Sequence, residues 1–365
     1  MTLPTGAGSG HLTGPVLIVG TGLLGTSIGL ALRRHGTEVL LTDVNTQNVS
    51  LASGLGAGVE ADPAGSARAR LVVVAVPPDH LATEIVRALE ETSAVVTDVG
   101  SVKGTPLRAV AARAPGHLAR YVGSHPMAGS ERSGPLASSA ALFDGRPWAV
   151  TPHPGSDVAA VKMVTALART CGATPVRLGP EEHDEAVART SHLPHLLAAL
   201  AAGRLADAPA PHLALSGQGV RDVTRVAAGD PALWQQIIAS NADAVGVLLE
   251  EIRRDVDTLL LAVREGDRDG VGRLLTRGVA GTSAIPGKHG APVQPTTTLY
   301  VAVPDHPGEL ARLLAEAGEV GVNVEDLHID HDPGRPVGLV ELVVLADQVH
   351  LLAESLESRG WTTHR

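Results

Sequence analysis

Cysteine, aromatic residues and positive charge are all scarce in this chain of 365 residues, and each shortage narrows what the protein can be. The single cysteine, Cys171, cannot form an internal disulfide, which fits a reducing, cytoplasmic location. Aromatic residues make up only 2% of the chain, so its core has to consist mainly of Leu, Val and Ala. A formal net charge of −10 argues against non-specific binding to nucleic acid.

A targeting or membrane segment is also missing from the sequence. The first fifteen residues carry no Lys or Arg, unlike the start of a secretory signal peptide, and we expect residues 1–13 to be a disordered lead-in. The apolar run 16–32 contains a GxxxG pair, but it is short, broken by glycine at its start and without a basic lead-in. The sequence therefore predicts no membrane span, and its length has room for two or three domains.

The stretch GTGLLG at positions 20–25 follows an apolar run of strand length and opens a helical pattern. Gly20 allows a tight turn, Gly22 lets the backbone approach phosphates, and Gly25 lets the helix pack closely on the strand. The helix N-terminus offers unpaired N–H groups and a positive dipole end to a pyrophosphate. Asp43 ends the next apolar run, where a carboxylate binds the adenosine ribose. We predict NAD, because Asp43 would repel the 2′-phosphate of NADP and no arginine directly follows it.

Short apolar runs alternate with helical patterns over residues 14–180, which is typical of a Rossmann-like, doubly wound parallel α/β sheet. The run 71–76 is fully apolar, as in a parallel strand buried on both faces. Ligands of such sheets lie beyond the carboxyl ends of the strands. We predict further strands over 94–98, 121–123, 148–150 and 175–178. The predicted NAD-binding residues are Gly20, Thr21, Gly22, Leu23, Leu24, Gly25, Asp43, Val76 and Pro77.

The strand pattern stops after residue 180, and residues 181–285 are expected to form an all-helical substrate and dimerisation domain. Asp230 and Pro231 are typical of an N-cap and a first helical position. Beyond them, apolar residues share one helical stripe. Long helices with broad apolar faces often bury them against a second copy, so we predict a homodimer. The stripe consists of Leu248, Ile252, Val256, Leu259 and Val263.

Residues 286–297 are rich in proline and glycine without periodicity, which predicts a linker. Beyond it, residues 298–365 carry the pattern strand, helix, strand, strand, helix, strand. That βαββαβ order is typical of a ferredoxin-like domain. The predicted strands are 299–303, 322–329, 337–345 and 361–363, and the predicted helices are 308–318 and 348–358.

Two polar stretches of the nucleotide domain could carry chemistry. Ser101 follows the strand 94–98, and it could also simply cap the next helix. His125 stands between Ser124 and Pro126 directly after a predicted strand, so we expect it on a turn at the carboxyl edge of the sheet, where it can act on a substrate. Alternatively, His125 could have a purely structural role.

Two further stretches lie in the helical domain. His192 and His195 are three residues apart, but no Cys or acidic ligand stands at a usual spacing, so we expect no metal site and one of the two facing the core. Arg225 lies four residues after Arg221 on one helical face, where guanidinium groups would suit a carboxylate substrate. Arg221 and the neighbouring Asp222 could instead be a solvated surface pair.

In combination, these stretches resemble the prephenate dehydrogenase (TyrA) family of tyrosine biosynthesis. The matching stretches are GTGLLGTSIGLAL, TDVGSVK, GSHPMAGSE, SHLPH and RDVTRVAAGDPALW, in the family's order. The resemblance implies an NAD-dependent oxidoreductase of aromatic amino acid biosynthesis, which decarboxylates prephenate oxidatively to 4-hydroxyphenylpyruvate. The tail, with DHPGEL at 305–310, resembles an ACT domain, a module that senses small molecules.

The resemblance also implies roles for single residues. His125 matches the histidine that hydrogen-bonds the C4 hydroxyl of the substrate, and Ser101 matches a serine near the same hydroxyl. Arg225 matches an arginine that binds a substrate carboxylate, and His195 a position near the pyruvyl side chain. The residues expected to shape or support the pocket are Ser191, His192, Asp222 and Trp234.

Several alternatives remain open at this point. His195 favours prephenate over L-arogenate, although one neutral imidazole can hydrogen-bond the distinguishing group of either. Gln218 stands where some relatives have glycine, which leaves the local pocket shape open. The ACT-like tail implies feedback by tyrosine, or else a dimerisation module without a ligand. The candidate effector residues are Asp305, Gly308 and Asn323.

Two other functions compete with this interpretation. A β-hydroxyacid reductase shares a nucleotide domain followed by helices, but it needs a catalytic lysine in the helical domain, and residues 181–285 contain none. A non-catalytic sensor of NAD and an amino acid is compatible with the tail. A sensor has no need of the set formed by Ser101, His125, His195 and Arg225, so we favour the enzyme.

Overall fold

The computed structural model describes residues 12, 14–129, 132–285, 295–331 and 337–365. The expected lead-in at 1–13 and linker at 286–297 therefore lie almost entirely outside the described residues. The chain divides into two compact units, residues 1–265 and 266–365, each of which is described by itself. Among the described helices, none has the length and apolar character needed to cross a membrane.

The first unit contains a five-stranded parallel sheet with the strand order β3-β2-β1-β4-β5. Its central strands are fully buried, as their uninterrupted apolar sequence requires. The run 16–32, which could have been an apolar membrane helix, is instead a strand, a glycine turn and a helix. The strands are β1 (Val16–Val19), β2 (Val39–Thr42), β3 (Val59–Glu60), β4 (Leu71–Val74) and β5 (Val95–Asp98).

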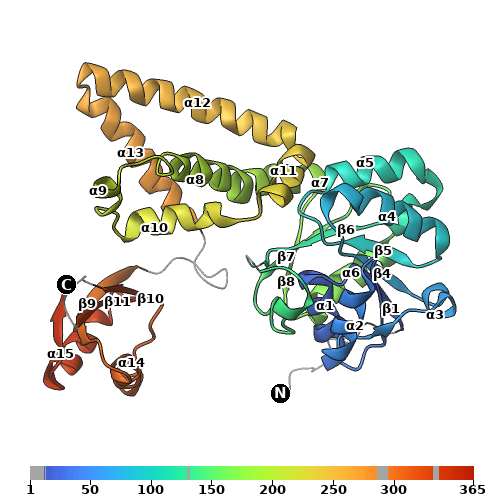
Figure 1. Cartoon of the computed structure of the whole chain (residues 1–365), viewed down its shortest axis with the longest axis horizontal. Helices are drawn as coiled ribbons and strands as arrows, with labels where there is room; N and C mark the ends of the chain where they lie inside the picture. Colours follow the sequence, from blue (N-terminus) through green and yellow to red (C-terminus); the bar gives the residue numbers. More distant parts are fainter. Residues whose placement is uncertain (1–11, 13, 130–131, 286–294, 332–336) are drawn as a thin grey trace, which may run out of the picture. The chain divides into compact units, whose positions relative to one another are not determined.

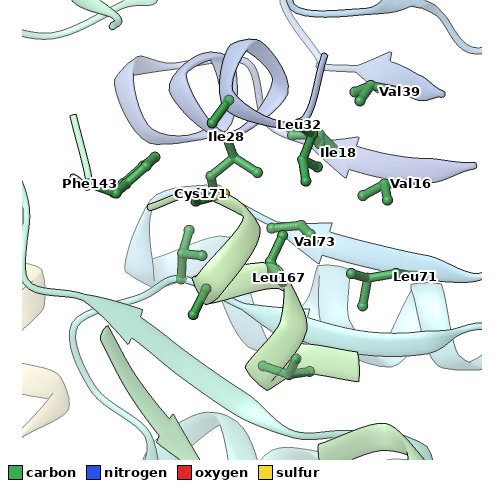
Figure 2. Packing of buried hydrophobic residues seen from close by; sticks show 14 of the residues in the cluster. Val16, Ile18, Ile28, Leu32, Val39, Leu71, Val73, Phe143, Leu167 and Cys171 are labelled. Atoms are coloured by element: carbon green, nitrogen blue, oxygen red, sulfur yellow. The ribbon is translucent and has the colours of Figure 1, made fainter. Parts of the chain in front are cut away.

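Helices cover both faces of this sheet, which confirms the doubly wound fold (Figure 1). Alternate residues of β1 point to opposite faces: Ile18 packs with α1, α2 and α6, and Leu17 packs with α4 and α5. Figure 2 shows Ile28 and Leu32 of α1 beside Ile18, with Leu167 of α6 in the same core. These helices and the short α3 are α1 (Leu23–Arg34), α2 (Thr46–Gly54), α3 (Pro63–Ala67), α4 (Pro78–Glu91), α5 (Gly104–Arg113) and α6 (Val158–Thr170).

A second sheet of three strands, in the order β6-β7-β8, follows the first and corrects one prediction. His125 does not lie on a turn after a strand, because β6 begins only at Gly123 and His125 pairs with Ala149 inside it. Of the expected strand 121–123, Tyr121 makes a single bridge with Val96 of β5, and Gly123 is the first residue of β6. The strands are β6 (Gly123–Pro126), β7 (Pro147–Thr151) and β8 (Thr174–Arg177), with η1 (Pro115–Arg120) and η2 (Pro135–Ala137) as 3-10 turns.

The helical part of the first unit begins with α7 at Pro180. Asp230 caps α11 by accepting a hydrogen bond from the N–H of Ala232 at 2.9 Å. A small apolar core contains Ala188, Val245 and Leu248. The elements are α7 (Pro180–Val187), the π-helical turn η3 (Ala188–His192), α8 (Leu193–Gly203), α9 (Ala210–Leu213), α10 (Gln218–Arg225), η4 (Val226–Ala228), α11 (Pro231–Ser240) and α12 (Ala242–Glu265).

The second unit begins with α13 (Arg268–Ser283) and continues into the predicted βαββαβ order. Its strands form one antiparallel sheet in the order β10-β11-β9-β12, with α14 and α15 packed on it (Figure 1). The ferredoxin-like fold class is therefore confirmed. The elements are β9 (Thr296–Pro304), α14 (Glu309–Glu319), β10 (Asp326–His331), β11 (Val337–Leu345), α15 (Val349–Ser358) and β12 (Thr362–His364).

Candidate active site

The glycine turn after β1 has the geometry that a bound pyrophosphate requires. Gly20 adopts φ of +99°, which favours glycine, and a Cβ there would lie 2.4 Å from the carbonyl oxygen of Ala75. A Cβ on Gly25 would lie 1.9 Å from the carbonyl oxygen of Gly20, so only glycine allows α1 to approach this closely. A Cβ on Gly22 would meet nothing within 4 Å. The space beside Gly22 is therefore open for the phosphates.

Asp43 is held at the end of β2, beside this turn. Its Oδ2 accepts hydrogen bonds from the N–H of Thr21 at 2.6 Å and from the Thr21 hydroxyl at 3.0 Å. Its Oδ1 accepts from the N–H of Asn45 at 2.8 Å. Partly exposed carboxylate oxygens in this place fit the ribose of a dinucleotide. The remaining residues predicted for the cofactor lie at the start of α1 (Leu23, Leu24) and directly after β4 (Val76, Pro77).

A buried ion pair lies at the carboxyl end of β5 and was not predicted. Lys103 Nζ pairs with the Asp98 carboxylate and donates to the carbonyl oxygen of Ser124 at 2.7 Å. The Tyr121 hydroxyl donates to Asp98 Oδ1 at 2.8 Å. Burial lowers the pKa of Lys103 and raises the pKa of Tyr121 well above its usual range. Because Ser124 precedes His125, this pair anchors the backbone that carries the candidate base.

His125 is hydrogen-bonded to residues of α7 that the sequence did not single out. Its Nδ1 lies 3.0 Å from His183 Nε2, and His183 Nδ1 lies 2.9 Å from Asp184 Oδ1. Burial is the main reason why the pKa of His125 is well below its usual range, with His183 and Lys103 as further causes. His125 is therefore a neutral imidazole near pH 7, as a general base must be.

The alternative role of Ser101 as a helix cap is wrong. Helix α5 begins at Gly104, and its N-cap residue, Lys103, makes no capping hydrogen bond through its side chain. Asp184 takes this place from a distant part of the chain, because its carboxylate accepts from the N–H groups of Lys103 at 2.7 Å and Gly104 at 2.8 Å. Ser101 is partly exposed in the loop between β5 and α5.

The two histidines of SHLPH lie on opposite sides of the junction between η3 and α8, and both are buried. His192 Nδ1 lies 3.2 Å from Asn241 Nδ2, and burial lowers the pKa of His192 to about 4. His195 stacks on Trp234 with 3.5 Å between ring centroids and an angle of 9° between the planes. Within the described ranges, no three His, Cys, Asp or Glu residues gather as metal ligands.

The remaining substrate candidates are exposed in the single chain. Arg225 ends α10, and Ser191 lies in η3. Asp222 Oδ1 accepts a hydrogen bond from Gln218 Nε2 at 2.9 Å, so the residue at the unusual position 218 contacts a predicted pocket residue. His125, Lys103 and residues of α7 thus form one cluster, whereas Arg225 lies on the surface of the helical part.

The effector candidates belong to the second unit. Gly308 adopts φ of +97° directly before α14, a conformation that favours glycine. Asn323 Nδ2 donates to Glu325 Oε1 at 2.7 Å. Asp305 is exposed in the loop that follows β9.

Comparison with solved structures supports the reading of the first unit. The structure of prephenate dehydrogenase from Aquifex aeolicus, in complex with hydroxyphenyl propionate and NAD⁺, matches with a TM-score of 0.67 and 29% identity, covering 74% of this chain and 98% of that one. Arogenate dehydrogenase from Synechocystis matches with a TM-score of 0.64 and 24% identity, covering 73% and 98%, and so shows the same fold.

Sequence comparison carries the assignment further. The "probable prephenate dehydrogenase NovF" of Streptomyces niveus is 37% identical over 357 residues, covering 94% of this chain and 98% of that protein. The prephenate dehydrogenase of Bacillus subtilis is 28% identical, covering 94% and 96%. Residues 28–177 match the model for the nucleotide-binding domain of prephenate dehydrogenase, and residues 179–277 match the model for its dimerization domain. The chain therefore belongs to the prephenate dehydrogenase family.

Proposed function

We propose that this chain is an NAD-dependent prephenate dehydrogenase that forms 4-hydroxyphenylpyruvate for tyrosine biosynthesis. The observation that carries the proposal is the place of His125, which follows Ser124, the residue that Lys103 holds at the carboxyl end of β5; burial also lowers the pKa of His125. The glycine turn after β1 opens at the same edge of the sheet, because β1, β4 and β5 are parallel. A base for the substrate and a site for the dinucleotide therefore share one edge.

NAD⁺ supplies the acceptor for the hydride that leaves C4 of prephenate. As the C4–H bond breaks, the O–H bond of the C4 hydroxyl also breaks, and its proton moves to His125. The bond to the ring carboxylate then breaks with loss of CO₂, and its electron pair makes the ring aromatic. The resulting phenolate oxygen takes the proton back from His125, so the residue ends neutral. Aromatisation drives the reaction forward.

The other assigned residues would bind and orient the substrate. Arg225 supplies a guanidinium group to a substrate carboxylate, and His195 lies near the pyruvyl side chain. Ser101 hydrogen-bonds the C4 hydroxyl together with His125. Holding the two reactants in register can lower the barrier by several kcal/mol. The pocket is completed by Ser191, His192, Asp222 and Trp234.

Turnover with defined substrates tests the proposal. The purified chain is mixed with NAD⁺ and either prephenate or L-arogenate, and nicotinamide absorbance is followed. We expect turnover with prephenate, and much slower turnover with NADP⁺, because Asp43 repels the 2′-phosphate. Faster turnover with L-arogenate would make the chain an arogenate dehydrogenase. Normal NAD⁺ binding without turnover of either substrate would favour the non-catalytic sensor.

The second unit is proposed to be an ACT-like module that binds tyrosine and inhibits the enzyme. The glycine conformation at Gly308 and the polar pair of Asn323 and Glu325 support a ligand site near the first strand–helix turn. Tyrosine should inhibit turnover by the unaltered chain, and Asn323→Ala should weaken that inhibition without changing the uninhibited rate. Absence of inhibition would leave a dimerisation module.

A cytoplasmic location, expected from the single cysteine, stays a prediction.

A homodimer through the helical part is also proposed. Leu248 of the predicted stripe is buried within the single chain, but Val256, Leu259 and Val263 of α12 are exposed. Such a row of exposed apolar residues marks an interaction surface. A second copy of this chain would cover this surface, because a twofold interface packs the apolar row of one copy against the same row of the other.

A further inference from the structure

Three side chains form a continuous hydrogen-bonded chain that ends at the candidate base. His125 Nδ1 contacts His183 Nε2 at 3.0 Å, and His183 Nδ1 contacts Asp184 Oδ1 at 2.9 Å. The two histidine rings meet edge to face, with 5.2 Å between centroids. His183 and Asp184 both belong to α7, the first helix after the nucleotide-binding part.

Asp184, at the far end of this hydrogen-bonded series, determines which nitrogen of each histidine carries the proton. The backbone N–H groups of Lys103 and Gly104 can only donate, so both Asp184 oxygens act as acceptors. His183 therefore donates its Nδ1–H to Asp184 Oδ1. A neutral His183 then has an unprotonated Nε2, which can only accept. His125 donates its own Nδ1–H to that nitrogen, and the lone pair of its Nε2 is left for the substrate.

Burial, more than the neighbouring charges, keeps both imidazoles neutral. Burial lowers the pKa of His183, as it does that of His125. The groups that face the two rings are Asp184 on α7, the ammonium of Lys103, its partner Asp98 at the end of β5, and His192 in η3. Asp184 and Asp98 favour a protonated His183 and Lys103 opposes it, but burial has the largest effect and disfavours the protonated ring.

Further hydrogen bonds fix the positions of His183 and Asp184. His183 is 1% exposed, and Asp184 is tied to the start of α5 by two hydrogen bonds. The backbone oxygen of Asp184 accepts from Asn241 Nδ2 at 2.8 Å, which ties α7 to the start of α12. A buried hydrogen-bonded histidine can either complete the packing or set the tautomer of its neighbour. The ordered donors and acceptors here favour the second role.

We propose that His183 and Asp184 are positioning residues, which hold His125 in the tautomer that leaves Nε2 free to take the hydroxyl proton of the substrate. The inference rests on the proposed dehydrogenase function. During the step, the substrate O–H bond breaks and an Nε2–H bond forms on His125, while its Nδ1–H stays shared with His183. Asp184 takes up no proton and stabilises the positive charge that forms on the two rings.

Two substitutions at His183 distinguish a role in positioning His125 from a role in packing alone. His183→Leu fills the space but cannot accept or donate, whereas His183→Gln has a carbonyl for His125 and an amide for Asp184. We expect His183→Leu to lower kcat by about 30-fold or more, within the range for general base catalysis. KM for prephenate and the affinity for NAD⁺ should stay within about twofold, because the His183 side chain is only 1% exposed and so leaves little surface for a ligand. His183→Gln should recover at least about tenfold of the lost kcat.

The matched control is His153, another buried histidine of the same unit, whose Nε2 contacts the carbonyl oxygen of Leu118 at 3.2 Å. His153→Leu and His153→Gln should leave kcat nearly unchanged. ¹⁵N NMR of labelled histidine gives a second readout: His125 should be protonated at Nδ1 in the unaltered chain and shift toward Nε2 in His183→Leu. That change of tautomer is not expected from a packing defect.

The inference is overturned if His183→Leu keeps kcat within about threefold of the unaltered chain, if Leu and Gln lower it equally, or if only KM changes. An NMR tautomer that the substitution does not alter overturns it as well, even if kcat falls. If the unaltered chain turns over neither substrate, the proposed function itself fails, and the inference with it.

Discussion

The two halves of the first unit differ in how fully a single chain buries their apolar side chains. In the nucleotide-binding half, β1 and β4 are buried on both faces by helices, and Asp43 is hydrogen-bonded to Thr21 of the glycine turn. In the helical half, the exposed apolar side chains include Leu215, which is 87% exposed, and Val263, which is 61% exposed. A sheet wrapped by its own helices buries its apolar faces within one chain, whereas this layer of helices leaves apolar side chains exposed.

The hydrogen-bonded cluster around His125 lies where these halves meet. His125 comes from β6, but His183 and Asp184 come from α7, and Asn241 ties them to α12. The candidate base therefore belongs to the nucleotide-binding half, while the residues that support it belong to the helical half. Each of the following experiments changes one side of this comparison.

The largest effect is expected for His125→Asn, in the nucleotide-binding half. Asparagine cannot take up the hydroxyl proton, so kcat should fall by about 10²- to 10⁴-fold. NAD⁺ affinity, measured by calorimetry, should remain within about twofold, because the glycine turn is built without His125. Turnover at the normal rate would remove His125 as the base.

A smaller effect is expected for Arg225→Ala in the helical half. Loss of a charge-assisted hydrogen bond costs about 1.5–3 kcal/mol, so KM for prephenate should rise by about 10- to 100-fold while NAD⁺ affinity is unchanged. Arg221→Ala, one turn earlier on α10, is the control and should have little effect. Steady-state kinetics with varied prephenate gives both values. An unchanged KM would take Arg225 out of the substrate site.

Val256→Asp tests whether the helical half is completed by a second copy. Val256 is 55% exposed in the single chain, and an unpaired carboxylate inside an interface costs about 3–5 kcal/mol. The dimer should therefore dissociate at least about 100-fold more readily, which light scattering over a dilution series detects. Thr258→Asp places the same charge on a polar position of α12 as the control. A dimer that Val256→Asp leaves intact would place the interface elsewhere.

The smallest effect concerns pH and the buried His192. Burial holds its pKa at about 4 in the folded chain, whereas an unfolded histidine titrates near 6.5. Between these values the unfolded chain binds a proton that the folded chain does not, so the free energy of unfolding falls as the pH drops. Between pH 7 and about 5.5 this loss should amount to about 1 kcal/mol.

His192→Gln should remove that part of the pH dependence. Urea unfolding of both chains at the two pH values measures the difference. An equal loss in the two chains would mean that His192 is as easily protonated when folded as when unfolded.

Local pattern was enough to predict much of the fold and part of the site. The glycine spacing at 20–25 predicted a turn that Gly20 now shows with its positive φ, and Asp43 lies beside it as expected. The strand predicted over 337–345 coincides with β11. These features depend on residues close together in the chain, whose spacing and polarity the sequence displays directly.

Features that depend on distant pairing could not be predicted. His125 was expected on a turn, because nothing local shows that residues 123–126 would pair with β7. Asp184 caps a helix 80 residues away, and Lys103 is buried beside Asp98. For Lys103 a signal did exist, since a charged residue soon after a buried strand that ends in Asp98 is a candidate for a buried pair.

The sequence by itself determined the dinucleotide turn, the alternation of strands and helices and the family. Glycine spacing and hydrophobic period are local properties, and the order of the motifs can be read along the chain without any tertiary contact. Only the tertiary structure decided how the base is supported. A hydrogen bond needs two groups about 3 Å apart in the right orientation, and for His125, His183 and Asp184 that geometry arises only when β6, α7 and α5 pack together.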